Sequence, residues 1–216
     1  MATRPCRLLC LAVLAGAAAA CAGLLGLDEP SLAGADAGAS CVGLGCASDQ
    51  VLIPGLCVCI DRYEATRGGG DAAKSVAGAQ PWTGATIAAA SVACGTAGKR
   101  LCTDAEWLAA CAGPAGRAYP YGETYDASAC RGDNVGDVPV ASGTMTRCEG
   151  GLPGLFDMSG NVREWSGSTD GAYVTARGGG YGDRPEDLDC AATVSFAAAV
   201  SSAAVGFRCC SAPSGT

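Results

Sequence analysis

The sequence predicts an α+β domain that is rich in loops and cross-linked by disulfides. Three observations support this prediction: a strand-like run over residues 51–66, two helical patterns after it, and 15 cysteines in a chain of 216 residues. Aromatic residues make up only 6% of the chain, so large aromatic side chains contribute little to the core. Because loop-rich chains cannot rely on regular packing, each cross-link is expected to contribute about 2–4 kcal/mol.

Residues 1–20 have the pattern of a signal peptide. Arg4 and Arg7 give a basic start, and residues 8–20 form an apolar run too short to span a bilayer. The small residues before Cys21 resemble a bacterial lipobox, with Ala where Leu is usual. A lipidated Cys21 would anchor the protein stably to a membrane of the cell envelope, either the outer membrane or the cell surface. The alternative is plain secretion with Cys21 in a disulfide.

The rest of the chain divides into a tether and one domain. Residues 21–49 are rich in Ala, Gly, Ser and Asp, which is typical of a flexible tether. Cys41 and Cys46 indicate that the end of this tether is bonded to the fold. Residues 50–211 have the length of a single domain with one core.

The domain opens with a run that predicts a strand. Apolar and polar residues alternate loosely over residues 51–66. Asp61 and Glu64 lie in this run, and paired carboxylates can perform acid–base chemistry. We favour the simpler interpretation, in which both are structural carboxylates with satisfied hydrogen bonds.

Two helices are predicted in the first half of the domain. Residues 82–94 are rich in Ala, and glycines follow them. The second helix begins after Thr103, because Thr103 and Glu106 have the spacing of a capping box. Gly113, followed by proline, ends this helix.

A glycine-rich loop then carries two carboxylates. Asp157 and Glu164 lie on either side of Gly160, where the backbone can turn freely. A loop that combines carboxylates with exposed carbonyls can bind calcium, which takes six to eight oxygen ligands. Spacing alone favours the alternative, a tight turn whose acids are solvated or cap a helix.

The cysteine count agrees with an exported domain. Two cysteines would leave with the signal peptide and Cys21 would carry lipid, so an even number remains for up to six disulfides. A zinc site is not expected, because Cys57-x-Cys59 and Cys209-Cys210 lack zinc-finger spacing and the chain has no histidine. If Cys209 and Cys210 lie in a strand, they point to opposite faces and have different partners.

Charge and composition exclude several functions. A chain without histidine cannot form a Ser-His-Asp or Cys-His catalytic arrangement. The formal net charge is −7, and an acidic surface disfavours nucleic acid and anionic lipid head groups. It favours cations, basic peptides or simply solubility.

Several segments resemble one enzyme family in the same order along the chain. Residues 154–165 read Gly-Leu-Phe-Asp-Met-Ser-Gly-Asn-Val-Arg-Glu-Trp and are similar to the signature Gly-Leu-Tyr-Asp-Met-x-Gly-Asn-Val-x-Glu-Trp of the formylglycine-generating enzymes, or sulfatase-modifying factors. Residues 98–107 resemble the family's Gly-x-Arg-Leu-Pro-Thr-Glu-Ala-Glu-Trp motif, with Cys102 in place of Pro, which suggests an added disulfide. The resemblance runs from about residue 51 to residue 210. It implies the family's loop-rich, disulfide-stapled fold, which is C-type-lectin-like.

The resemblance also implies calcium ligands. In the first site they are the side chains of Asp157 and Glu164 and the carbonyls of Gly160 and Val162. Asn134 and the carbonyl of Val135 match half of a second calcium site. The insert that carries the other half in the family is missing, and Asp137 is the nearest substitute.

The family's copper site is altered in this chain. In the family, an Arg-Gly-Gly segment precedes two cysteines, separated by four residues, that bind copper(I). Here the segment begins at Arg177, and Asp183 and Leu188 occupy the two cysteine positions. A carboxylate and an isobutyl group cannot replace two thiolates, so neither copper nor a catalytic residue is expected. Cys190 is expected in a disulfide. The acids of this segment either hold a cation or form a solvated surface loop, and we favour the loop; they are Asp183, Glu186, Asp187 and Asp189.

Three functional hypotheses follow from the resemblance and these departures from it. The first is a lipid-anchored, calcium-stabilised, non-catalytic module that binds a peptide or glycan where the active site would have been. The second is an oxidoreductase of the formylglycine-generating type that acts on protein cysteine. The third is a structural protein of the envelope. The replaced cysteine pair favours the first hypothesis over the second.

Overall fold

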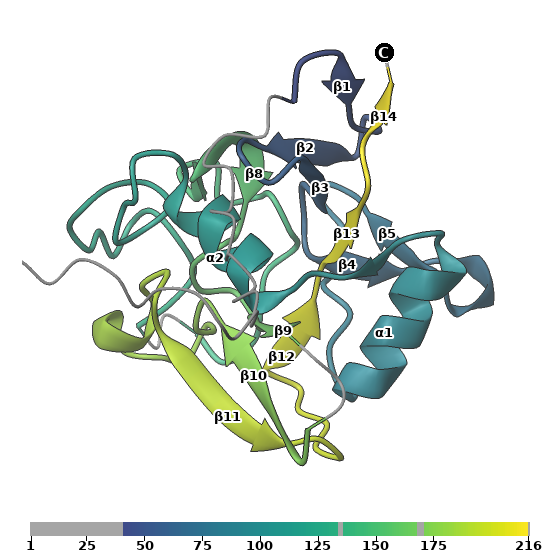
Figure 1. Cartoon of the computed structure of the whole chain (residues 1–216). Helices are drawn as coiled ribbons and strands as arrows, with labels where there is room; N and C mark the ends of the chain where they lie inside the picture. Colours follow the sequence, from purple (N-terminus) through teal and green to yellow (C-terminus); the bar gives the residue numbers. More distant parts are fainter. Residues whose placement is uncertain (1–40, 134–135, 168–170, 216) are drawn as a thin grey trace, which may run out of the picture. The chain divides into compact units, whose positions relative to one another are not determined.

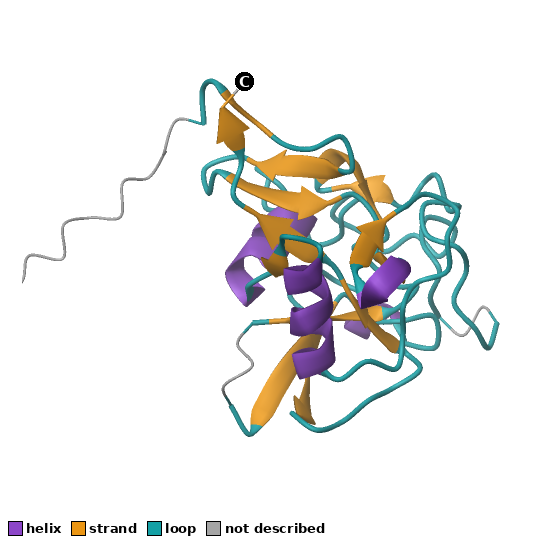
Figure 2. Ribbon diagram, turned by 90° about the vertical axis from the view of Figure 1, so that its right-hand side faces the viewer, coloured by secondary structure: helices purple, strands orange, loops and turns teal. Residues whose placement is uncertain are grey.

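A computed structural model describes residues 41–133, 136–167 and 171–215, and Figure 1 shows how their helices and strands are arranged. The regular elements are short, and one side of the view in Figure 2 consists almost entirely of loops. No helix among these residues is long and apolar enough to span a bilayer. The predicted signal peptide, Cys21 and most of the predicted tether lie outside the described residues.

The first four-stranded sheet is antiparallel and joins the two ends of the domain. Its order is β2 (Gln50–Ile53), β3 (Val58–Asp61), β13 (Cys209–Ser211) and β6 (Arg100–Leu101). The predicted run over residues 51–66 is therefore not one strand but a hairpin followed by the start of β4. Gly55 and Cys57 have positive φ angles of 81° and 49°, which reverse the chain between β2 and β3.

The second four-stranded sheet carries the predicted calcium loop. Its order is β11 (Thr193–Ala197), β10 (Tyr173–Arg177), β9 (Arg163–Ser166) and β12 (Val205–Phe207). β12 runs parallel to β9, and the other pairs are antiparallel. Glu164 and Trp165 are neighbours on β9 and are both buried. Successive side chains of a strand point to opposite faces, so Glu164 and Trp165 lie in different surroundings on the two sides of the sheet.

Short strand pairs and 3-10 turns complete the regular structure of the described residues. The pairs are β1 (Leu44–Gly45) with β14 (Ser214–Gly215), β4 (Ala65–Arg67) with β5 (Ala73–Ser75), and β7 (Glu149–Gly150) with β8 (Leu152–Phe156). The 3-10 turns are η1 (Gly69–Asp71) and η2 (Pro185–Asp187).

The first helix is shifted relative to the sequence prediction. α1 spans Ile87–Thr96, whereas the Ala-rich pattern indicated residues 82–94. The shift has a local cause: the side chain of Thr86 accepts a hydrogen bond from the backbone N–H of Ala89 at 3.2 Å and so fixes the helix start.

The second helix confirms its prediction at both ends. α2 spans Asp104–Ala112. Thr103 Oγ1 accepts from the backbone N–H of Glu106 at 3.3 Å, and Glu106 Oε2 accepts from the backbone N–H of Thr103 at 2.9 Å, which completes the capping box. Gly113 ends the helix with a φ of 62°.

Two clusters of buried side chains form most of the core. One joins α1 to the second sheet and includes Ile87, Cys94, Trp165, Val174, Val205 and Phe207. The other joins α2 to β2, β3 and β8 and includes Ile53, Ile60, Trp107, Leu155 and Met158. Each helix therefore covers its own part of the strand framework, and the predicted calcium loop lies where the two parts meet.

Six disulfides use every cysteine of the described residues. They are Cys41–Cys57, Cys46–Cys59, Cys94–Cys209, Cys102–Cys210, Cys111–Cys190 and Cys130–Cys148. The predictions that Cys209 and Cys210 have different partners, and that Cys102 forms an added bridge, are confirmed. The bonds of Cys41 and Cys46 attach the segment before β2 to the fold, as predicted. Such a density of disulfides fits an extracellular or envelope protein.

Candidate functional site

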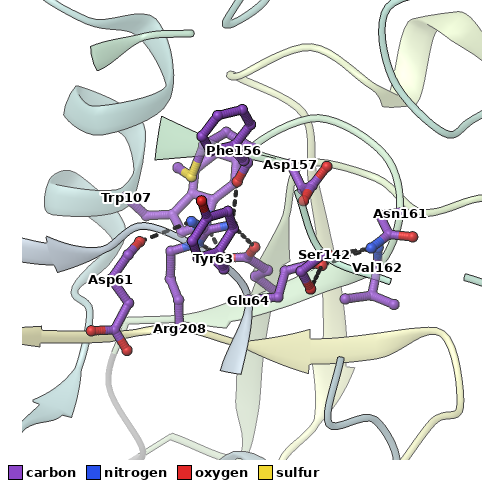
Figure 3. Close-up of polar contacts among 12 residues, drawn as sticks. Asp61, Tyr63, Glu64, Trp107, Ser142, Phe156, Asp157, Asn161, Val162 and Arg208 are labelled. Carbon is purple, nitrogen blue, oxygen red and sulfur yellow. Dashed lines mark hydrogen bonds and ion pairs between the residues drawn. The ribbon is translucent and has the colours of Figure 1, made fainter. Parts of the chain in front are cut away.

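Three buried carboxylates and one buried guanidinium come together from three segments of the chain, and Figure 3 labels Glu64, Asp157 and Arg208 among them. We call Glu64, Asp157, Glu164 and Arg208 the carboxylate cluster. None of the four residues is more than 3% exposed. Ionisable groups are rarely buried so completely unless they are paired, so each must find its partners inside the protein.

Arg208 and Glu164 form a bidentate ion pair within the cluster. Arg208 Nε and Nη2 donate to Glu164 Oε2 and Oε1 at 2.7 and 2.6 Å, and Trp107 Nε1 donates to Oε2 at 2.7 Å. Arg208 also donates to the carbonyls of Asp61 and Phe156, both at 3.0 Å. One guanidinium thereby connects β3, β8 and β9.

Glu64 makes a separate set of contacts. Its carboxylate accepts hydrogen bonds from Ser142 Oγ at 2.7 Å, Asn161 Nδ2 at 2.7 Å and the backbone N–H of Val162 at 3.2 Å. Asp61 lies in a different ion pair, on β3. The interpretation of both as hydrogen-bonded structural carboxylates therefore agrees with their surroundings.

The loop before β9 has several residues with positive φ angles, a conformation that glycine, Asn and Asp adopt most readily. Asp157, Gly160 and Asn161 have positive φ angles of 58°, 74° and 54°. A Cβ on Gly160 would lie 2.0 Å from the carbonyl oxygen of Arg131, so no larger residue fits there. Asp157 Oδ2 accepts from the backbone N–H of Gly143 at 2.6 Å.

The charges of the cluster are not balanced. Burial raises the pKa of Asp157 to about 6, against the opposing effects of the Gly143 N–H and of Arg208. Burial also raises the pKa of Glu64 well above its usual value, and the charges of Asp157 and Glu164 raise it further. Three carboxylates share one guanidinium, so two negative charges remain for protons or a cation to neutralise.

The four predicted calcium ligands belong to this cluster and its loop. Asp157 and Glu164 are members of the cluster, and Gly160 and Val162 lie between them on the chain. The excess negative charge fits a divalent cation. Glu164 fits less directly, because both its oxygens already accept hydrogen bonds from Arg208 or Trp107. Among the described residues, no three acidic or cysteine side chains are already arranged as metal ligands.

Most of the second predicted calcium site lies outside the residues that the structure describes. Asn134 and Val135 are not among the described residues, and Asp137 nearby is exposed. Both calcium assignments therefore stay predictions.

The two positions of the family's copper ligands have other contacts. The carboxylate of Asp183 pairs with Arg163 and accepts from the backbone N–H of Gly180 at 2.7 Å. Leu188 is only 1% exposed, and a Cβ on Gly132 would lie 2.5 Å from its side chain. Asp183 thus forms an ion pair and Leu188 fills space in the interior.

The segment from Arg177 to Cys190 is fixed at both ends. Arg177 forms an ion pair with Asp104 at the start of α2, and its Nη1 donates to the carbonyl of Cys190 at 3.2 Å. Cys190 is in a disulfide, as predicted, and its partner is Cys111. Glu186 and Asp187 are exposed and Asp189 is partly exposed, which agrees with the predicted surface loop. Asp183 differs from that prediction, because its carboxylate is mostly buried in the ion pair with Arg163.

Sequence reasoning missed several residues that shape this region. Arg208 and Trp107 were not identified as partners of Glu164, because they lie 44 and 57 positions away along the chain. A group of three tyrosines was also missed, although the close spacing of Tyr119, Tyr121 and Tyr125 was a visible signal.

The fold and the site define a loop-rich, C-type-lectin-like domain with a buried acidic cluster under its signature loop. Residues 59–213 match the family model described as the sulfatase-modifying factor enzyme 1-like domain. The chain belongs to this family, and the family predicted from the sequence is confirmed.

The chain is also similar to parts of two chlamydial proteins. It is 32% identical over 150 residues to serine/threonine-protein kinase pkn1 of Chlamydia caviae, and the match covers 60% of this chain and 24% of that protein. It is 33% identical over 149 residues to Pkn1 of Chlamydia trachomatis, with 59% and 23% covered. The chain thus spans about a quarter of the length of these relatives.

Solved structures share the fold at low sequence identity. Treponema denticola variable protein 1 has a TM-score of 0.57 and 16% identity, covering 72% of this chain and 84% of its own. PvdO from Pseudomonas aeruginosa has a TM-score of 0.54 and 15% identity, covering 71% and 79%. The I1 variant of the major tropism determinant has a TM-score of 0.57 and 15% identity, covering 79% and 54%. These likenesses confirm the predicted C-type-lectin-like fold.

Proposed function

We propose that this chain is a non-catalytic binding module of the cell envelope. Its ligand, a peptide or a glycan, would bind at the face where relatives carry the copper-binding cysteines. The single observation that carries the proposal is that the residues at those two positions have structural contacts instead of copper-binding side chains. Asp183 is held in an ion pair with Arg163, and Leu188 is packed in the interior.

We expect copper(I) to find no suitable donors here among the described residues. The ion prefers soft thiolate ligands, and the sulfur nearest in sequence, that of Cys190, is already bonded to Cys111. The other cysteines among the described residues are also in disulfides. The proposed function therefore includes no oxidation step.

The test is a direct assay for the family's reaction. The full exported chain, loaded with copper(I), is incubated aerobically with a peptide that contains Cys-x-Pro-x-Arg, and mass spectrometry follows the peptide cysteine. We expect no formylglycine and no sub-micromolar copper(I) binding in a chelator competition. Formylglycine formed by the wild-type chain would overturn the proposal in favour of an oxidoreductase.

We also propose that calcium stabilises the domain through the carboxylate cluster. Asp157 and Glu164 would supply side-chain oxygens, and Gly160 and Val162 would supply carbonyls. Two uncompensated negative charges beside a glycine-rich loop support this assignment. Calcium would hold the loop before β9 in place and would take no part in chemistry.

A lipid on Cys21 would attach the module to the envelope. Support for this part comes from the sequence, where small residues precede Cys21 after a short apolar run. Labelling with radioactive palmitate is expected for the wild type and not for Cys21→Ser. Equal labelling of both proteins would rule out this anchor.

A further inference from the structure

Three tyrosines form a surface beside the altered segment. Tyr119, Tyr121 and Tyr125, which we call the tyrosine surface, lie in the long loop between α2 and β7. The rings of Tyr119 and Tyr121 stack with centroids 5.5 Å apart and planes 17° apart, and Tyr125 meets Tyr119 at 5.9 Å and 55°. All three side chains are partly exposed. Tyr121 also packs against the small core cluster of Ala129, Cys130 and Cys148. The exposed parts of Tyr119 and Tyr125 therefore remain for a ligand.

A local turn keeps these rings together. Tyr119 and Gly122 form a β-bridge, with hydrogen bonds of 2.9 and 3.1 Å between their backbones. The hydroxyl of Tyr121 accepts from the backbone N–H of Asp126 at 3.4 Å. The hydroxyl of Tyr119 donates to the carbonyl of Pro185 at 3.3 Å. This last contact ties the tyrosine surface to η2, between positions 183 and 188.

Carboxylates surround the rings. Burial raises the pKa of Tyr119, and the charges of Asp189 and Glu186 raise it further. Burial also raises the pKa of Tyr125, with Asp133 as the next cause. The contact of the Tyr119 hydroxyl with the carbonyl of Pro185 supports this placement for Glu186, the next residue of η2.

Three of the nearby carboxylates form no ion pair within the described part of the chain. Asp126 is paired with Arg147 at 2.5 Å. By contrast, no ion pair joins Asp133, Glu186 or Asp189 to any other residue of the described ranges. Aromatic faces with unpaired negative charges beside them attract cations in two ways, through the ring quadrupole and through direct charge attraction.

We propose that the tyrosine surface binds the Lys or Arg side chain of a basic peptide. This inference rests on the proposed binding function and names its ligand class. A neutral sugar could stack on the rings but would leave the carboxylate charges unmatched. A basic side chain matches both the rings and the charges. The contact of Tyr119 with η2 places this ligand beside the positions where the family's cysteines would lie.

Fluorescence anisotropy with labelled oligolysine tests the proposal on the full exported chain. Binding by the wild type is expected, with little binding of a labelled Gly-Ser peptide of equal length. The Tyr125→Leu variant should bind oligolysine about fivefold to tenfold more weakly, because a ring face is lost while every charge is kept. Tyr125→Phe should bind nearly as well as the wild type, since the ring face remains.

Two controls separate this site from general acidity. Tyr173→Leu removes a tyrosine that is 75% exposed on β10 and should leave the affinity unchanged. The single variant Glu186→Gln should weaken binding more than Asp71→Asn, which neutralises one exposed acid in the turn between β4 and β5. Melting temperatures close to that of the wild type verify that each variant is folded.

The binding experiments test the basic-peptide inference independently of the proposed non-catalytic function. Equal affinity for Tyr125→Leu and wild type would mean that oligolysine senses only the overall negative charge, which overturns the inference. Binding of a neutral oligosaccharide that depends on Tyr125, without peptide binding, would also overturn it in favour of a glycan. Neither result bears on the formylglycine assay, which alone decides whether the module is catalytic.

Discussion

Arg208 is the residue on which the geometry of the carboxylate cluster depends. It is fully buried, and it is the only positive charge in contact with Glu164 among the described residues. Its other donors reach carbonyls beside β3 and β8. Loss of this side chain would remove the counter-charge and several hydrogen bonds together.

We therefore predict a large and graded effect of substitution at Arg208. Arg208→Met leaves three buried carboxylates without a counter-charge and should lower the free energy of unfolding by about 3–5 kcal/mol at pH 7.5. Arg208→Lys keeps the charge but loses the two-pronged contact with Glu164, so it should cost less. Urea denaturation measures both. Arg184→Met, at an exposed arginine, should change stability by less than about 0.5 kcal/mol. Similar losses for Met and Lys would show that the charge itself is unimportant.

The raised pKa values at Asp157 and Glu64 predict how pH acts on the calcium-free protein. Because the folded pKa of Asp157 is about 6 and the usual value is 3.8, the folded state binds more protons than the unfolded state between these values. Stability should therefore fall as pH rises through this window. Each pKa unit corresponds to about 1.4 kcal/mol. In EDTA, the melting temperature should be several degrees lower at pH 7.5 than at pH 5.5.

Calcium should reverse this trend if it binds the cluster. The ion favours the ionised carboxylates, so its addition should raise the melting temperature more at pH 7.5 than at pH 5.5. Asp157→Asn should remove most of both effects, while Asp187→Asn, at an exposed acid, should keep them. A melting temperature that calcium leaves unchanged at pH 7.5 would end the calcium assignment.

At the scale of single elements, the sequence predicted best where the signals were local. The start and end of α2 could be predicted because Thr103, Glu106 and Gly113 act within one turn of the helix. The start of α1 was predicted too early, because Ala content does not mark a boundary and the cap at Thr86 was overlooked. The hairpin between β2 and β3 was missed because the apolar run on both sides of Gly55 hid the turn.

Only those residues of the candidate site that are neighbours in sequence could be predicted. The loop from Asp157 to Glu164 could be recognised as an oxygen-rich turn, since its residues are neighbours in sequence. Its partners Glu64 and Arg208 come from segments 98 and 44 positions away, and no periodicity links them. Pairing over such distances is set by the tertiary fold, which local spacing cannot reveal. The different disulfide partners of Cys209 and Cys210 could be predicted, because adjacent side chains of a strand point to opposite faces.

The capping box of α2 gives a prediction for one element. Thr103→Ala removes the oxygen that accepts from the Glu106 N–H and should lower the free energy of unfolding by about 1 kcal/mol. Thr103→Ser keeps an oxygen at this position and should stay within a few tenths of a kcal/mol of the wild type. Urea denaturation of the three proteins measures the difference. Equal stability of the Ala and Ser variants would show that the cap contributes nothing.

At the scale of the whole molecule, two neighbouring disulfides restrict the unfolded chain in nearly the same way. Cys94 at α1 and Cys102 before α2 are bonded to the adjacent residues Cys209 and Cys210 of β13. Their sequence separations are 115 and 108 residues, so both bridges close nearly the same long loop of the unfolded chain. While one bridge is present, the other closes only a short additional loop.

This redundancy predicts that the two bridges are not additive. In the chain-entropy description, removing either one with paired Cys→Ala substitutions should cost about 2–3 kcal/mol, as for a loop of roughly ten residues. Removing both opens a loop that the Cys111–Cys190 bridge shortens to roughly 36 residues, which adds about 1 kcal/mol beyond the sum of the single losses. The bridge between Cys130 and Cys148 serves as the control, because it closes its own loop and its removal should add to either single loss without coupling. Guanidinium denaturation of the single, double and control variants measures these terms. Purely additive losses would mean that the bridges act through local packing of the folded state, and that restricting the unfolded chain contributes little to the stability of this domain.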